Sequence, residues 1–179
     1  TRESSLVGVN RLRVPNRWPN CLSNEWRKAL CDLYSRLCEL ALAATRAVGL
    51  GLGIGEDGLA NMCCQGSEIS LMRCFHYFQQ AGQNMTGSSA HTDWGFLTVI
   101  LPEPDKTGLE VFHADKWQRV SCSEGHFLVN CGDYLSLITH GRLVSPLHRV
   151  VLTDDERISF VLFFYPDYHA AFPQLRSLS

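Results

Sequence analysis

The sequence changes its hydrophobic period near residue 68, and this change constrains the fold more than any other feature. From Asn24 to Val48, apolar residues recur every three or four positions, and charged residues occupy the other side. That pattern is typical of one long amphipathic helix. Ser23 is a suitable N-cap, and the glycine-rich stretch 49–53 is expected to end the helix. After residue 68, short apolar segments alternate with turn residues, which indicates strands.

Eight segments in the second part of the chain carry the strand pattern. The predicted strands are 70–78, 95–101, 108–112, 117–120, 127–130, 135–139, 148–151 and 158–165. Many short strands without helical periods between them favour two packed antiparallel sheets over a parallel α/β sheet. We therefore expect a mainly β protein with helices, a double-stranded β-helix (jelly roll) preceded by a long amphipathic helix.

Charge and cysteine content restrict the kinds of binding partner and the cellular compartment that we expect for this protein. The chain of 179 residues has 16 basic and 18 acidic residues and a net charge of −2, which predicts no surface for nucleic acid or for an anionic membrane. No apolar run reaches the roughly 20 residues that span a bilayer. The eight cysteines follow no disulfide or zinc-site spacing, and no signal-peptide pattern opens the sequence. We expect a cytoplasmic (intracellular) protein with reduced thiols and a small-molecule substrate.

Two side chains that bind metals stand at the head of the apolar run HTDWGFLTVI, residues 91–100. In an extended segment, positions i and i+2 project to the same side, so His91 and Asp93 point to one place. A second histidine would complete the two-histidine, one-carboxylate triad of non-haem iron(II) oxygenases. His148 is the preferred candidate, because it begins a strand-like run directly after a turn. Later histidines also occur at positions 113, 126, 140 and 169.

A second pair with period-two spacing follows these histidines. Arg157 and Ser159 lie on one side of a predicted strand, where a guanidinium and a hydroxyl can bind a carboxylate together. Arginine suits this role because its planar group binds a carboxylate with two hydrogen bonds and keeps its charge. The apolar neighbours of the pair indicate an interior strand, in which an unpaired guanidinium would be costly.

Four segments together carry a resemblance to a known family. They are HTDWGFLTVI, GLEVFHADKWQRV, FLVNCGDYLSLITHGRLVSPLHRVV and RISFVLFFYPD, in this order and at these intervals. From about residue 68 to 168, the chain resembles the iron(II)/2-oxoglutarate-dependent dioxygenases, specifically the isopenicillin N synthase-like branch. The resemblance implies a jelly-roll oxidoreductase.

The resemblance also implies roles for individual residues. The iron ligands and catalytic centre of the family fall on His91, Asp93 and His148. The family motif that binds the distal carboxylate of 2-oxoglutarate falls on Arg157 and Ser159.

A tyrosine near the same cosubstrate falls on Tyr77, in the segment LMRCFHYF. Arg73 and Phe75 lie on the same side of that strand and are candidates to line the substrate cavity. The implied cofactor is Fe(II), with 2-oxoglutarate and O₂ as cosubstrates and, in some members, ascorbate. The implied reaction couples oxidative decarboxylation of 2-oxoglutarate to hydroxylation, desaturation or ring closure of a small organic substrate.

The domain limits follow from the change of period and from the resemblance. We expect residues 1–67 to form an N-terminal helical extension that packs on the jelly roll, and residues 68–179 to form the Fe(II)/2-oxoglutarate dioxygenase core. Members of the branch are typically longer, so the extension is interpreted as truncated. This leaves open whether the chain is active as it stands.

Two alternative functions remain compatible with the sequence. The branch contains non-haem iron oxidases that need no 2-oxoglutarate, and at least some of them keep the arginine and serine pair. A jelly-roll binding module, or an inactive relative with a structural metal such as zinc, is the other alternative. O₂ uptake with substrate or ascorbate alone tests the first, and elemental analysis together with an O₂ assay tests the second. Neither the substrate nor the oligomeric state is identified.

Overall fold

The computed structural model describes residues 15–66, 68–79 and 85–171. Its described residues form two compact units. One unit contains residues up to 70 together with 165–171, and the other contains residues 71–164. Residues of the predicted extension before position 15 and at position 67 lie outside the described residues, as do those of the predicted core at 80–84 and 172–179.

The first unit is built around the helix α1 (Asn24–Gly51). Ser23 caps it, since its side chain accepts a hydrogen bond from the Trp26 amide at 3.3 Å, so the predicted helix and its N-cap are confirmed. The buried positions of α1 follow at intervals of four and are Leu37, Ala41, Thr45 and Gly49. This spacing places them on one face of the helix.

A short helix, α2 (Asp57–Ala60), follows α1 and was not predicted. Within the described residues, no helix combines the length and the apolar character that crossing a membrane requires. The packing of this helical part on the jelly roll stays a prediction.

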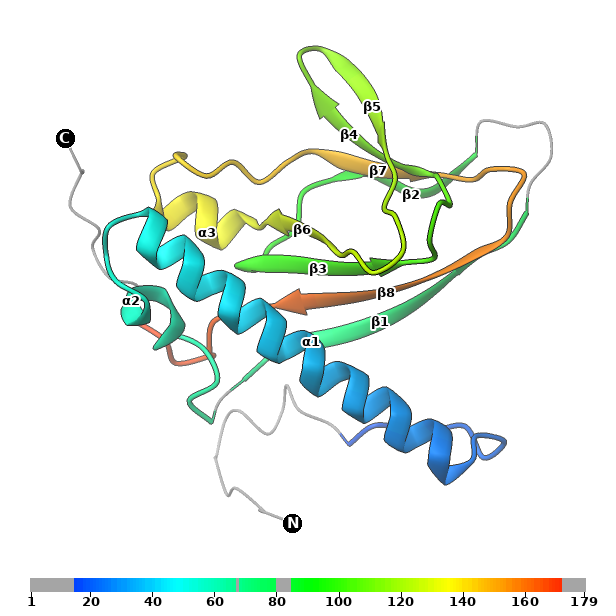
Figure 1. Ribbon diagram of the computed structural model, residues 1–179, viewed down its shortest axis with the longest axis horizontal. Helices are drawn as coiled ribbons and strands as arrows, with labels where there is room; N and C mark the ends of the chain where they lie inside the picture. Colours follow the sequence, from blue (N-terminus) through cyan, green and yellow to red (C-terminus); the bar gives the residue numbers. More distant parts are fainter. Residues whose placement is uncertain (1–14, 67, 80–84, 172–179) are drawn as a thin grey trace. The chain divides into compact units, whose positions relative to one another are not determined.

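The second unit consists of two four-stranded sheets, in which all strand pairs are antiparallel (Figure 1). One sheet has the order β1-β8-β3-β6, and the other has the order β2-β7-β4-β5. This arrangement confirms the predicted jelly roll. The strands are β1 (Leu71–Tyr77), β2 (Thr86–His91), β3 (Leu97–Pro102), β4 (Leu109–His113), β5 (Lys116–Val120), β6 (Leu128–Cys131), β7 (His148–Val151) and β8 (Arg157–Phe164).

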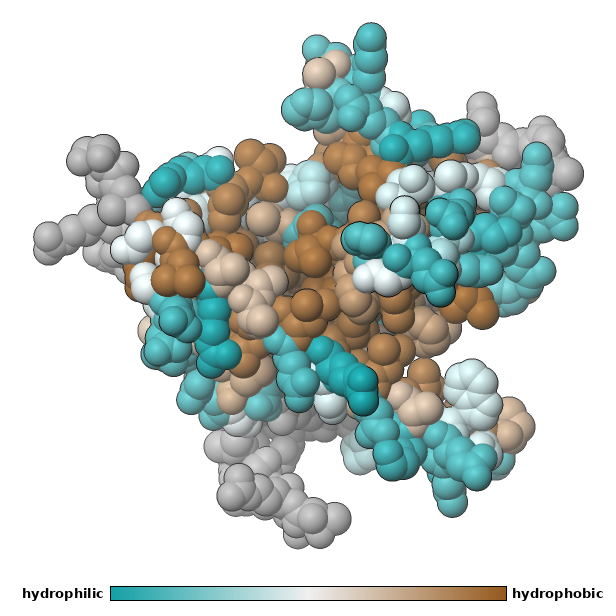
Figure 2. Space-filling view, viewed as in Figure 1, coloured by the Kyte–Doolittle hydropathy of each residue, from teal (hydrophilic) through white to brown (hydrophobic). Residues whose placement is uncertain are grey.

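The hairpin of β4 and β5 projects from its sheet in Figure 1. Ala114 and Asp115 join the two strands, and both have positive φ angles, 49° and 60°, as a tight two-residue hairpin turn requires. Figure 2 shows hydrophilic side chains over the tip of this hairpin and hydrophobic ones nearer its base. The base therefore belongs to the packed part of the sheet, and the tip extends into solvent.

The predicted strand 135–139 is wrong, because this segment lies in the helix α3 (Asp133–Ile138). The apolar residues at 135 and 137 suggested alternation, but the buried pair in the structure is Leu135 and Ile138, three residues apart. Leu137 is 69% exposed. Gly132 precedes α3 in an extended conformation and starts the helix.

Strand β2 was missed for the opposite reason. Its sequence, TGSSAH, contains one small apolar residue and gives no alternating hydrophobic signal. It forms a strand because it pairs with β7, in a register that is irregular between Thr86 and His91. Pairing with a neighbour, rather than local preference, defines this strand.

Both faces of β8 are buried in the second half of the strand, whereas Ile158 near its start is 44% exposed. Leu162 and Phe164, on one face, are at most 1% exposed. The alternate positions, Arg157, Ser159 and Val161, line a cavity between the two sheets. Two polar residues of β8 therefore face the interior of the jelly roll.

Candidate functional site

The three predicted metal ligands lie together at one end of this cavity. His91 is the last residue of β2 and stands opposite His148, the first residue of β7. Asp93 follows His91 by two positions, and one ligand atom of each of the three residues lies within 4.8 Å of the others. Among the described residues, this is the only group of three or more histidine, cysteine or acidic side chains that is arranged to hold a metal ion. The other candidate histidines, at 113, 126, 140 and 169, are outside it.

Backbone carbonyl groups orient both imidazole rings. Nδ1 of His91 lies 2.7 Å from the carbonyl oxygen of Ser89, and Nδ1 of His148 lies 2.9 Å from that of Pro146. A carbonyl only accepts hydrogen bonds, so each Nδ1 carries the proton. Each Nε2 then faces Asp93, at 3.6 Å and 3.7 Å from its carboxylate oxygens. The tautomer that presents an Nε2 lone pair to a metal is thereby selected.

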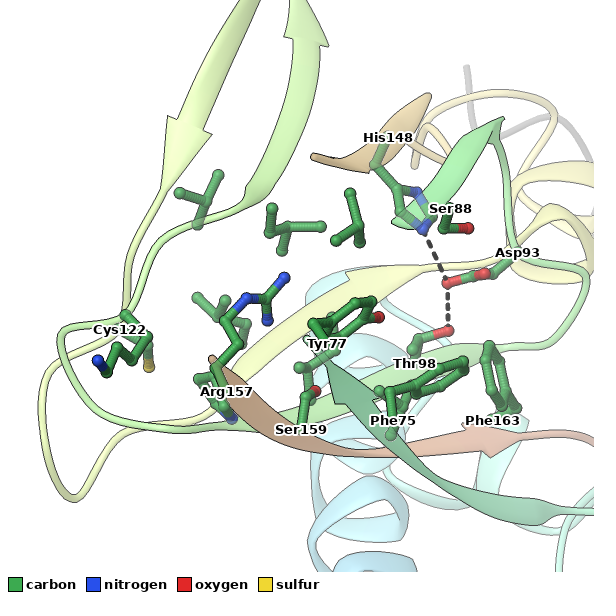
Figure 3. A pocket seen from close by; sticks show the side chains of 18 of the residues that line it. Phe75, Tyr77, Ser88, Asp93, Thr98, Cys122, His148, Arg157, Ser159 and Phe163 are labelled. Carbon is green, nitrogen blue, oxygen red and sulfur yellow. Dashed lines mark hydrogen bonds and ion pairs between the residues drawn. The ribbon is translucent and has the colours of Figure 1, made fainter. Parts of the chain in front are cut away.

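The carboxylate of Asp93 is buried and held by two donors. Its Oδ2 atom accepts hydrogen bonds from Thr98 Oγ1 at 2.6 Å and from Asn130 Nδ2 at 3.1 Å, and Figure 3 shows the first of these. Within the described part of the chain, Oδ1 accepts no hydrogen bond and faces Nε2 of His91. One oxygen is thus fixed by the protein, and the other is available to a metal.

The start of α3 holds the backbone around Asp93. The Gly132 amide donates to the Phe96 carbonyl at 2.8 Å, and the Asp133 amide donates to the Asp93 carbonyl at 2.7 Å. A side chain at position 132 would overlap the Gly95 carbonyl, so glycine is required for this close approach. The segment that the sequence suggested as a strand is therefore a helix that fixes the position of a predicted ligand.

The three predicted cosubstrate residues line the same cavity as the triad (Figure 3). The cavity contains about 680 Å³ of empty space, counting the part open to solvent. On its wall, Tyr77 of β1 stands opposite Arg157 of β8. Phe75 also lines the cavity, but Arg73 does not.

Arg157 is the most unusual side chain in the cavity. It is 7% exposed, and its Nη2 atom is buried without a hydrogen-bond partner in residues 15–66, 68–79 and 85–171. The guanidinium carbon lies 4.1 Å from the centre of the Tyr77 ring, a cation–π contact. Burial lowers the pKa of this guanidinium, and the neighbouring Tyr77 opposes that effect. An unpartnered buried donor costs about 1–3 kcal/mol, more when it is charged, so the site favours an anion.

Two glycines leave the space that the side chains of Arg157 and Tyr77 occupy. A Cβ atom on Gly108 would lie 2.7 Å from Arg157 Nη2, and Gly108 has a φ of +134°. A Cβ atom on Gly87 would lie 2.9 Å from Cδ1 of Tyr77. Burial raises the pKa of the Tyr77 hydroxyl, while Arg157 acts against this shift. The hydroxyl of Tyr77 is therefore kept protonated and able to donate a hydrogen bond.

Sequence reasoning missed the residues that support the site. Thr98 and Asn130 stand opposite each other on β3 and β6, yet they lie 32 positions apart in the chain. Only a weak signal for them exists in the sequence: each is the polar residue in an otherwise apolar run, FLTVI or FLVN. Gly108 gave no signal, because its role depends on a side chain from another strand.

Comparisons with known proteins agree with this geometry. The family model of the 2OG-Fe(II) oxygenase superfamily matches residues 68–166. The 2-oxoglutarate-dependent dioxygenase caaD of Aspergillus niger is 31% identical over 92% of this chain and 52% of its own length. Isopenicillin N synthase of Streptomyces jumonjinensis is 31% identical over 83% of this chain and 48% of its own length.

Solved structures also resemble this chain. The crystal structure of JOX2 in complex with 2OG, Fe and JA superposes with a TM-score of 0.81, at 26% identity, over 90% of this chain and 48% of that one. The chain spans about half the length of the curated relatives it matches. The family resemblance predicted from the sequence is confirmed.

Proposed function

The chain belongs to the 2OG-Fe(II) oxygenase superfamily, and from this premise we propose that it is an Fe(II)- and 2-oxoglutarate-dependent oxygenase. It couples the oxidative decarboxylation of 2-oxoglutarate to the oxidation of a small organic substrate. One observation carries the proposal: a buried guanidinium with an unpartnered nitrogen lines the same cavity as a cluster of two histidines and one aspartate. The cluster suits a metal, and the guanidinium suits a dicarboxylate.

The donor set fits iron(II). His91 and His148 would bind the metal through Nε2, and Asp93 through its free carboxylate oxygen, Oδ1. Two imidazoles and one carboxylate are the ligands of non-haem iron(II) oxygenases, and three protein ligands leave other coordination positions open. Bound iron supplies the activation of O₂ that no protein side chain provides.

The other end of the cavity fits the distal carboxylate of 2-oxoglutarate. Arg157 and Ser159 both face the cavity and are buried, and Tyr77 lies against the guanidinium. A hydrogen bond between a guanidinium and a carboxylate is about twice as strong as a neutral one. In this role, binding of the cosubstrate satisfies Nη2 of Arg157, which has no acceptor among the described residues.

The experiment is decarboxylation of 2-oxoglutarate labelled at C1, with Fe(II) present or absent. We expect CO₂ and succinate in equal amounts, only with Fe(II), and loss of both products in His148→Ala. The variant Arg157→Ala is expected to weaken 2-oxoglutarate binding by tenfold or more while the affinity for the metal is unchanged. Equal loss of both affinities would contradict the role of Arg157. A folded, iron-loaded protein that neither binds nor turns over 2-oxoglutarate would refute the proposal.

Measurements of O₂ uptake and of metal content separate the alternatives. O₂ uptake with substrate or with ascorbate, and no 2-oxoglutarate, would identify an oxidase of the same fold. Tightly bound zinc without O₂ uptake would identify a structural metal in a binding module.

We also propose that the protein acts in the cytoplasm on a small molecule, and not on nucleic acid or at a membrane. The net charge of −2 supports the exclusion of nucleic acid and of an anionic membrane, because neither surface would attract the protein.

A further inference from the structure

Strands β1 and β8 form a continuous inner wall of the cavity. In their antiparallel register, Tyr77 stands opposite Arg157, Phe75 opposite Ser159, and Arg73 opposite Val161. All of these residues except Arg73 line the cavity. Because side chains two positions apart point to the same side of a strand, Arg73 belongs to the same inner face.

The metal-ligand end of this wall is the end where Arg73 lies. Thr98 of β3 stands opposite Phe163 of β8, and the Thr98 hydroxyl donates to Asp93. The ring of Phe163, which lines the cavity, is therefore level with the ligand cluster. The guanidinium carbon of Arg73 lies 5.6 Å from the centre of that ring. The wall thus carries Arg73 near the ligands and a second arginine, Arg157, which lies six positions before Phe163 on β8.

The two arginines differ in exposure. Arg157 is 7% exposed, whereas Arg73 is exposed. No carboxylate pairs with Arg73 among the residues that the structure describes. The cation–π contact with Phe163 holds the guanidinium beside the cavity without neutralising its charge. Arg73 is therefore a permanent cation at the edge of the cavity, open to an anion that arrives from solvent.

We propose that Arg73 binds a carboxylate of the primary substrate, which is an organic acid with an apolar body. The inference rests on the proposed function, in which Arg157 takes the distal carboxylate of 2-oxoglutarate. The primary substrate then approaches the metal from the opposite side, where Arg73 stands. Its apolar body packs on Phe75 and Phe163, whose rings face the same space.

The test uses the full chain loaded with Fe(II) and 2-oxoglutarate under anaerobic conditions, so that binding is measured without turnover. Probes are phenylacetate, 4-phenylbutyrate and octanoate, each compared with its uncharged primary amide, by calorimetry. We expect at least one acid to bind wild type about tenfold or more tightly than its amide, since a charge-assisted hydrogen bond distinguishes the two. In Arg73→Gln that preference is lost, and in Arg73→Lys it is partly kept.

Arg142→Gln is the matched control, because it removes one exposed positive charge from the same unit. It is expected to bind acids as wild type does. The inference is overturned if no acid is preferred over its amide by wild type, or if the preference survives in Arg73→Gln. It is also overturned if Arg73→Gln weakens 2-oxoglutarate as much as the acids, because Arg73 would then serve the cosubstrate. Failure of wild type to bind 2-oxoglutarate refutes the proposed function instead.

Discussion

The hydrogen bond from Thr98 to Asp93 offers the sharpest test of how the protein prepares its ligand cluster. At 2.6 Å it is the shorter of two bonds to Oδ2, and both partners are buried, at 2% and 5% exposure. Thr98→Val keeps the size and branching of the side chain and removes only the donor. The variant therefore isolates the hydrogen bond from packing.

The expected loss follows from the charge of the acceptor. A hydrogen bond to a charged group contributes about 1.5–3 kcal/mol, and each 1.4 kcal/mol corresponds to about tenfold in affinity. Asn130, which donates to the same oxygen at 3.1 Å, is unchanged in the variant, and this keeps the loss toward the lower end. We expect the dissociation constant for a divalent metal to rise by about tenfold to a hundredfold, in the range found for residues that orient metal ligands.

The assay is calorimetric titration of the metal-free protein with Mn²⁺, which binds without redox chemistry. Thr98→Ser keeps the hydroxyl and is expected to bind the metal nearly as wild type does. Circular dichroism and the melting temperature establish that each variant is folded. An unchanged metal affinity in folded Thr98→Val would refute the claim that Thr98 positions Asp93. Equal losses in the serine and valine variants would also contradict the claim, because the serine variant keeps the donor.

Two further predictions concern other parts of the chain. Gly108→Ala places a Cβ atom 2.7 Å from Arg157 Nη2, so the affinity for 2-oxoglutarate, measured by calorimetry, should fall by tenfold or more with metal binding unchanged. Gly125→Ala, also at positive φ but in open space, should leave both unchanged. Burial raises the pKa of Cys63 from 9.0 to about 12. Between these values the unfolded thiol ionises first, so denaturant-measured stability should fall with rising pH, and by less in Cys63→Ala.

The sequence allowed prediction of those site residues that follow a local rule. His91 and Asp93 are separated by two positions, as are Arg157 and Ser159, and period-two spacing in an extended chain predicts that each pair faces one way. The start of β7 at His148 followed from the turn before it. The prediction that these segments meet at one site came from the family resemblance. No local rule specifies which strands become neighbours.

The supporting residues escaped prediction because their roles arise only from strand register. Thr98 and Asn130 form a cross-strand pair between β3 and β6, and both donate to one carboxylate oxygen. A register shift of one residue in either strand would turn its side chain to the other face of the sheet. Their role therefore depends on the sheet as a whole, and a polar residue in an apolar run is the only local trace it leaves.

The error at α3 has the same origin and reveals how the ligand segment is fixed. A helix begins with amide groups that lack partners inside the helix, and the amides of Asp133 and Tyr134 donate to the carbonyls of Asp93 and Trp94 at 2.7 and 3.1 Å. These acceptors lie 40 residues earlier in the chain, so the local pattern of Leu135 and its neighbours carries no record of them. Because the same bonds cap the helix and hold the backbone at Asp93, the start of α3 and the geometry of the ligand segment depend on each other. A change that unwinds the first turn of α3 should therefore weaken metal binding without touching any ligand.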